Sequence, residues 1–232
     1  MSVRTLTLDN PEKSNALSAA AVDGLLKDVK AAYRDGTETL VFAGKGKNFC
    51  AGFDLSDLDG ATDAGLIERF VRIEELLQAV YMAPFDTVAC AKGATWGAGA
   101  DIFAACRWRL ADESARFAMP GLQFGIVLGT RRLGALIGEA EAYELLSQGK
   151  PIDARRALEL GLASAIEPEA RWPGLIEQRQ AARRIKGDAL ARLSAQTRRD
   201  TCAADMKALV DSASVPGLVE RIRRYRASLK KS

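Results

Sequence analysis

The chain has 232 residues, of which 48% are hydrophobic and 27% charged, so it can bury one sizeable core as a globular protein does. Its formal charge of +3 is small and gives no reason to expect nucleic acid or an anionic membrane as a partner. The absence of histidine excludes Ser-His-Asp and Cys-His nucleophile systems and histidine-based zinc sites. Any catalysis must therefore use carboxylates, main-chain dipoles, lysine or tyrosine, and we predict no metal site.

The cysteines and the hydropathy of the sequence indicate where in the cell the protein is expected. The four cysteines are far apart in the sequence and form no C-x-x-C pair, and no secretory leader precedes them, which predicts reduced thiols in the cytoplasm. Cys50 is expected to be a small buried hydrophobe, because no histidine exists to activate its thiol. No run of about 18 apolar residues is present, so no membrane-spanning helix is predicted.

The first half of the chain alternates predicted strands and helices. Residues 3–9 alternate as a strand does, and turn residues followed by apolar residues at helical spacing come next. Two further strands are predicted at residues 39–43 and 86–91. Between them lie a glycine- and lysine-rich loop and an amphipathic helix with one apolar face: Leu66, Phe70, Ile73, Leu77 and Tyr81. A short apolar helix over residues 102–106 then leads into a strand at 107–111.

The second half is mostly helical, with one short strand predicted at residues 162–166. This order predicts a parallel α/β core over residues 1–170 and a C-terminal helical region over residues 171–232. The last helix carries an apolar side made of Leu218, Ile222, Tyr225 and Leu229. Such a helix is expected to pack on a partner subunit or on the core of its own chain.

Residues 95–103, TWGAGADIF, raise the question of what approaches the main chain there. A dinucleotide-binding loop needs a third glycine, and that position is Ile102. Two loops, CAGFD at 50–54 and WGAGAD at 96–101, instead place small residues after a strand and before a helix, where free N–H groups point outward. Two such donors can stabilise one enolate or tetrahedral oxyanion, an effect of roughly 3 kcal/mol per donor.

The chain resembles the crotonase superfamily, that is, the enoyl-CoA hydratase/isomerase family, over nearly its whole length. Four motifs carry the resemblance in order: LDNPEKSNALS, GKGKNFCAGFDLSDL, AKGATWGAGADIFAACRWRLADESARFAMPGLQFGI and GKPIDARRALELGLA. The resemblance implies a ClpP/crotonase ββα-superhelix core with a C-terminal helical oligomerisation region. It also implies an acyl-CoA thioester substrate of fatty acid metabolism, coenzyme A as part of that substrate with no permanently bound cofactor, and a homotrimer or hexamer.

Site residues follow from matching positions. The resemblance implies that the N–H groups of Phe53 and Ala98 hold the thioester oxygen. It places Asp101 at the first of two carboxylate positions that hydratase members use, and Gly121 at the second, where no carboxylate exists. Contacts with the coenzyme A portion or the thioester are implied for Lys13, Ala16, Leu17, Ala51, Gly52, Asp54, Leu55 and Gly97.

Alternatives remain open at several of these positions. Asp101 could simply cap a helix start, and Asp54 and Asp57 are expected to cap the helix that follows their loop. Trp96 is expected in a pocket wall or in the core. The missing carboxylate at Gly121 weakens hydration and double-bond isomerisation alike, because positioned acid-base groups contribute about 10²- to 10⁴-fold each. A coenzyme A thioester-binding relative with little or no activity, or a thioester hydrolase, is therefore the alternative.

Overall fold

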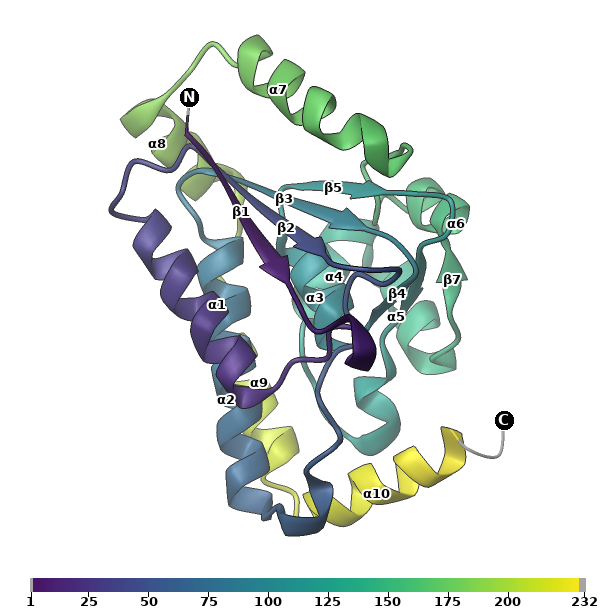
Figure 1. The fold of residues 1–232 in the computed structure, drawn as a ribbon. Coiled ribbons are helices and arrows are strands. Elements are labelled where there is room, and N and C mark those ends of the chain that lie inside the picture. Colours follow the sequence, from purple (N-terminus) through teal and green to yellow (C-terminus); the bar gives the residue numbers. More distant parts are fainter. Residues whose placement is uncertain (1, 230–232) are drawn as a thin grey trace.

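A computed structural model describes residues 2–229 (Figure 1). The main sheet has five parallel strands in the order β1-β2-β3-β5-β8: Val3–Leu8, Thr39–Gly44, Asp86–Ala91, Trp108–Ala111 and Ala165–Ile166. β2 and β3 are buried along almost their whole length, as expected of strands that are covered on both faces of a parallel sheet. The predicted parallel α/β core is confirmed.

A second, smaller sheet has three strands that alternate along the chain with those of the main sheet. Its strands are β4 (Ala94–Trp96), β6 (Arg116–Ala118) and β7 (Ile152–Asp153), with β4 parallel and β7 antiparallel to β6. The sequence did not predict these strands, because two or three residues are too few to show a two-residue period. β4 matters for function, since it ends at the loop that precedes the buried helix α3 (Ala98–Ala105).

Helices cover both faces of the main sheet. On one face α1 (Ala19–Ala32) packs against α2 (Asp63–Tyr81). Of the predicted apolar face of α2, Leu66, Phe70, Ile73 and Leu77 are buried and Tyr81 is partly exposed. On the other face α7 (Trp172–Ala182) covers alternate residues of the strands, with Trp172 and Ile176 against Val41 and Val88. The alternation of β2 between these two clusters is the period-two pattern of a strand.

The remaining helices lie around both ends and one edge of the sheet (Figure 1). The α-helices are α4 (Thr130–Ile137), α5 (Glu139–Gln148), α6 (Ala154–Glu159), α8 (Gly187–Thr197), α9 (Cys202–Ala213) and α10 (Leu218–Leu229). Short 3-10 helices lie at Pro11–Lys13, Leu58–Gly60, Pro120–Phe124 and Glu169–Arg171. α9 packs against α2, and α10 contacts both α2 and the 3-10 helix Pro120–Phe124, so these C-terminal helices lie on their own core. Within the described chain, no helix combines the length and apolar character needed to cross a membrane.

The cap of α2 differs from the prediction. The Thr62 side chain accepts a hydrogen bond from Gly65 N at 3.1 Å and caps the helix. Asp54 instead accepts from Ser56 N at 2.9 Å within its own loop, and Asp57 makes no capping hydrogen bond. The expectation that Asp54 and Asp57 cap this helix was wrong, because a 3-10 turn lies between them and α2.

Candidate active site

Main-chain hydrogen bonds hold two distant loops side by side. Trp96 N donates to Cys50 O at 2.8 Å, and Cys50 N donates to Ala94 O at 3.1 Å, so the CAGFD loop continues the edge of β4. The same loop also pairs with the segment around Leu17, through Leu17 N to Gly52 O at 2.7 Å. These bonds fix the relative position of the loops whatever side chains they carry.

Gly52 allows a close approach between the loops. Its φ is +86°, a left-handed conformation that glycine adopts without strain. A Cβ atom there would lie 2.5 Å from Trp96 O and 3.3 Å from Ala98 N. Any side chain at this position would therefore push the first loop away from the N-terminus of α3.

Two main-chain N–H groups are left unpaired by this arrangement. Gly52 O and Asp54 N both bond to Leu17, at 2.7 and 3.1 Å, so the N–H of Phe53 between them points to the other side. Ala98 is the first residue of α3, where an N–H has no intrahelical acceptor. Neither N–H finds an acceptor within residues 2–229, and both residues line one pocket.

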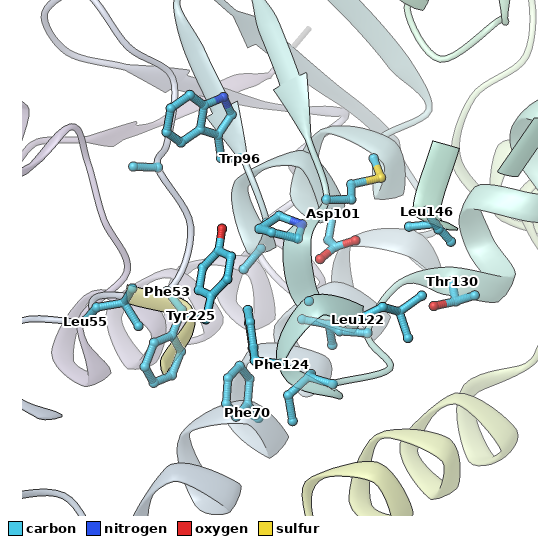
Figure 2. Close-up of a pocket in the computed structure, with 18 of the residues that line it drawn as sticks. Phe53, Leu55, Phe70, Trp96, Asp101, Leu122, Phe124, Thr130, Leu146 and Tyr225 are labelled. Carbon is cyan, nitrogen blue, oxygen red and sulfur yellow. The ribbon is translucent and has the colours of Figure 1, made fainter. Parts of the chain in front are cut away.

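That pocket encloses about 120 Å³ and is mostly apolar. Figure 2 shows its walls, which include Phe70, Leu122 and Phe124. The side chain of Trp96 is 42% exposed and forms part of the wall, which settles its place outside the core. Seven residues singled out from the sequence meet here: Ala51, Phe53, Leu55, Gly97, Ala98, Asp101 and Gly121.

The other predicted coenzyme A contacts lie outside the cavity. Lys13 Nζ donates to Ser56 Oγ at 3.0 Å and lies 3.6 Å from a carboxylate oxygen of Asp54. Ala16 is partly exposed beside them, whereas the side chain of Leu17 is 1% exposed and belongs to the core. Leu17 therefore serves this region through its main chain.

Asp101 is buried without a hydrogen-bonding partner. It lies in the first turn of α3 and lines the pocket, and its carboxyl group makes no hydrogen bond within the described part of the chain. Burial raises the pKa of Asp101 to about 8, with Arg132 acting in the opposite direction and Glu74 adding to the rise. The carboxyl group is thus protonated at neutral pH. It does not cap α3, whose N-cap residue is Gly97.

Glycines shape the space around this carboxyl group. A Cβ atom at Gly129 would lie 2.0 Å from Asp101 Oδ1, so the carboxyl group rests against the bare main chain that precedes α4. Gly121, in the 3-10 helix Pro120–Phe124, supplies a stretch of wall without a side chain. Asp101 is thereby the one carboxylate side chain among the described residues of the wall.

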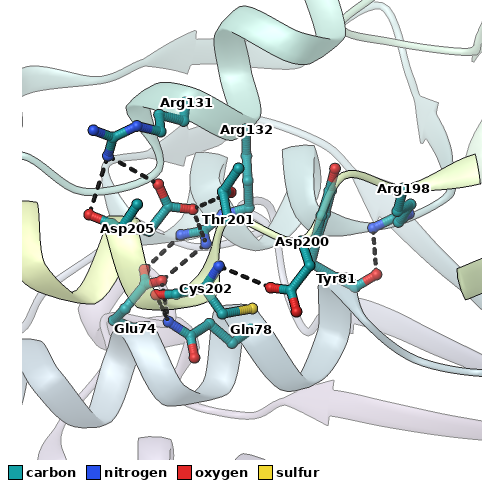
Figure 3. Close-up of polar contacts among 11 residues, drawn as sticks. Glu74, Gln78, Tyr81, Arg131, Arg132, Arg198, Asp200, Thr201, Cys202 and Asp205 are labelled. Atoms are coloured by element: carbon teal, nitrogen blue, oxygen red, sulfur yellow. Dashed lines mark hydrogen bonds and ion pairs between the residues drawn. The ribbon is translucent and has the colours of Figure 1, made fainter.

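An ionic cluster around Arg132 (Figure 3) acts electrostatically on Asp101, and Arg132 Nε has no hydrogen-bond partner within residues 2–229. Arg132 Nη1 and Nη2 donate to the two carboxylate oxygens of Glu74 at 2.9 and 2.5 Å, and Nη1 also donates to Asp205 at 3.1 Å. Thr201 Oγ1 donates to the same Asp205 oxygen at 2.7 Å. This cluster was not predicted from the sequence. Glu74 follows Phe70 by four residues and so lies on the apolar face of α2, which indicates a buried acidic side chain.

The thiol of Cys50 is buried, as predicted. Its residue is 0% exposed, and burial raises the pKa of the thiol to about 12. A nucleophilic thiolate at neutral pH is therefore not available at this position.

Tyr225 of α10 also lines the pocket. The sequence predicted the apolar face of the helix that carries this residue, but not its place in the pocket wall.

Comparison with known proteins decides the family. The sequence model described as Enoyl-CoA hydratase/isomerase matches residues 1–210. The chain belongs to this family. A crystal structure of a protein assigned to it from Bordetella parapertussis is 44% identical, with a TM-score of 0.93 over 97% of this chain and 94% of that one. The predicted membership of the crotonase superfamily and the crotonase-like fold are both confirmed.

Two further relatives have lower sequence identity to this chain. A "Probable enoyl-CoA hydratase" of Bacillus subtilis is 34% identical over 169 residues, which are 70% of this chain and 64% of that protein. The enoyl-CoA hydratase structure from Bacillus halodurans is 23% identical with a TM-score of 0.83, a likeness of fold. The matched segment spans about three fifths of the length of the first curated relatives of this family member.

Proposed function

We propose that this family member acts on an acyl-CoA thioester whose carbonyl oxygen lies between the N–H groups of Phe53 and Ala98. One observation carries the proposal: two unpaired main-chain donors from distant segments line the same apolar pocket as an unpaired, protonated carboxyl group. Donors fixed by the fold need no reorganisation as charge develops on the oxygen, which is where such sites gain most of their effect.

Asp101 is the sole acid-base group in the proposal. In hydration of an enoyl thioester, the two amides would stabilise the enolate as the oxygen of water adds to the β carbon. Asp101 would give its proton to the α carbon from one carboxyl oxygen and take the surplus proton of the water on its carboxylate. The C=C bond is consumed, one C–O and one C–H bond form, and Asp101 ends protonated as it began. Its raised pKa fits this cycle, because the acid must hold a proton at the start.

The coenzyme A portion would leave the pocket past the CAGFD loop. Lys13 is the exposed cation there, with Ala16 and Asp54 beside it, and the carboxyl group of Asp54 holds Lys13 near the loop. Coenzyme A thus enters with the substrate, and the proposal needs no resident cofactor.

The assembly proposal rests on the C-terminal helical region from residue 171 onward. We propose a homotrimer or hexamer in the cytoplasm, supported by exposed apolar side chains such as Leu193 at 48% and Val215 at 52%. Light scattering on the purified protein measures the mass directly, and a monomer at micromolar concentration would contradict the proposal.

The experiment for the reaction uses a panel of thioesters. Purified protein is incubated with crotonyl-CoA and longer enoyl-CoAs, and products are read by mass spectrometry while binding is measured by calorimetry. We expect binding together with conversion to the 3-hydroxyacyl-CoA or the shifted double bond. Failure to bind any member of the panel would defeat the proposed function.

Gly121 supports a second candidate, a thioester-binding protein with little activity or a thioester hydrolase. The wall at Gly121 carries no carboxylate, so water activation depends on Asp101 alone. Release of free thiol from the same panel would identify hydrolysis. Tight binding without any product would identify the inactive relative, and turnover that Asp101→Asn abolishes would exclude it.

A further inference from the structure

Helix α10 is fixed over the pocket by buried apolar side chains and by the hydrogen bonds of one arginine. Leu218 and Ile222 are fully buried against the cluster that includes Phe70. Arg221 donates to four carbonyl oxygens: Phe124 O at 2.9 Å, Gly125 O at 3.3 Å, Val215 O at 2.9 Å and Ser212 O at 3.3 Å. The helix is therefore tied to the 3-10 helix that carries Gly121.

Tyr225 follows these anchors by one turn and reaches the cavity. Its ring lies 5.1 Å from the ring of Phe124, and the residue lines the same pocket as Ala98 and Asp101. Figure 2 shows the hydroxyl projecting into the pocket, away from Phe124 and toward the space between Trp96 and Asp101. A polar group thus faces the region where the acyl carbons next to the thioester would lie.

The hydroxyl of Tyr225 has no partner within residues 2–229. Partial burial raises the pKa of this phenol above its usual value, so the group keeps its proton at neutral pH and acts as a hydrogen-bond donor and acceptor. An apolar pocket that closes over a substrate would leave such a hydroxyl desolvated unless the bound molecules supply a partner. An oxygen of the bound substrate or of a water molecule beside it would satisfy the hydroxyl.

We infer that Tyr225 is a second catalytic residue, whose hydroxyl holds the oxygen that is added to or removed from the acyl group while Asp101 moves the protons. The inference rests on the proposed function. Tyr225 would occupy the role left open by Gly121, reaching the pocket from a different element. No proton passes to or from the phenol in this role: it orients the oxygen by hydrogen bonding, and the proton balance of the Asp101 cycle is unchanged.

The test compares two ligands that differ by one hydroxyl group. Binding of butyryl-CoA and of 3-hydroxybutyryl-CoA is measured by calorimetry for the wild type, for Tyr225→Phe and for Tyr143→Phe. Tyr143 is a matched control because it is 75% exposed on α5 and lies outside the pocket. We expect the wild type and Tyr143→Phe to prefer the hydroxylated ligand by about three- to tenfold, the size of one hydrogen bond. Tyr225→Phe should lose that preference while it binds butyryl-CoA within about twofold of the wild type.

Kinetics add a readout that a purely structural role would not change. With crotonyl-CoA, Tyr225→Phe should lower kcat by about ten- to hundredfold at nearly constant KM, with the same thermal unfolding midpoint as the wild type. A preference that survives Tyr225→Phe, or a wild type that binds both ligands equally, would overturn the role of Tyr225 and leave the proposed function standing. A wild type that binds neither thioester would overturn the proposed function, and the inference with it.

Discussion

Two buried acidic regions lie close together in this enoyl-CoA hydratase/isomerase family member, and they are built in opposite ways. Asp101 is enclosed by α3, the pocket wall and Gly129, with no hydrogen bond within the described chain. Glu74 and Asp205 are equally buried, but Arg132 satisfies both. The charge of a buried carboxyl group without a partner is costly, whereas hydrogen bonds from an arginine compensate for the burial of a carboxylate. The unpaired carboxyl group of Asp101 is suited to proton transfer. The paired carboxyl groups of Glu74 and Asp205 hold helices together through Arg132.

The largest effect should come from removing the unpaired acid. Asp101→Asn is expected to lower kcat for an enoyl-CoA by about 10²- to 10⁴-fold, because no other carboxylate of the wall can replace it. Binding affinity should change little. Asp59→Asn, an exposed acid outside the pocket, is the matched control in steady-state assays. For the wild type the rate of hydration should decline above about pH 8, as Asp101 loses the proton that it must deliver.

Breaking the paired cluster should cost stability instead. Arg132→Met leaves Glu74 and Asp205 buried without a counterion, and we expect the free energy of unfolding to fall by about 3 to 5 kcal/mol in urea titrations. Arg131→Met is the comparison, because Arg131 is half exposed and touches Asp205 only at 3.3 Å. Equal losses from the two variants would show that burial of the cluster carries no special cost.

The stability of the same Asp101→Asn variant should depend on pH differently from that of the wild type. Unfolded chains lose the Asp101 proton near pH 4, but the folded chain keeps it to about pH 8, so wild-type stability falls as pH rises between these values. Asparagine carries no such penalty. We expect the variant to match the wild type near pH 4 and to exceed it by roughly 1 to 4 kcal/mol at pH 8. Parallel denaturation curves at both pH values measure this, and a constant difference would contradict it.

The smallest effect is expected from an ion pair on the surface. Lys207 pairs with Asp211 on α9, but both side chains are more than half exposed. Lys207→Ala should change the free energy of unfolding by about 0.5 kcal/mol or less. A loss comparable with that of Arg132→Met would mean that the stability cost comes from breaking an ion pair and does not depend on its burial.

The longer elements could be predicted from the sequence, because each carries a signal over several consecutive residues. β2 and β3 are short runs of mostly apolar residues, and the apolar face of α2 repeats at helical spacing. β4, β6 and β7 were not predicted, because they are short and are fixed by pairing partners distant in the chain. At the candidate site, the two loops and Asp101 were recognised through motifs that lie within continuous segments.

Contacts between segments could not be predicted in the same way. The apolar face of the last helix was evident, but its position over the pocket depends on Arg221 meeting Phe124 O, which no local pattern encodes. The Arg132 cluster likewise joins α2, α4 and α9. Glu74 on an apolar face was a visible signal of a buried partner, yet the sequence could not say which cation would meet it.

The hydrogen bond from Trp96 N to Cys50 O has a consequence for how this scaffold can diversify. In the proposed function the thioester oxygen is held by main-chain N–H groups, so this half of the site depends little on the surrounding side chains but does depend on glycines such as Gly52 and Gly99, where a Cβ would meet Trp96 O or Cys50 O. In the same proposal the other half consists of the side chains of Asp101, which moves protons, and Tyr225, which holds an oxygen, while Gly121 leaves a third wall position without a side chain. New reactions can then arise by replacing one half while the other is inherited intact.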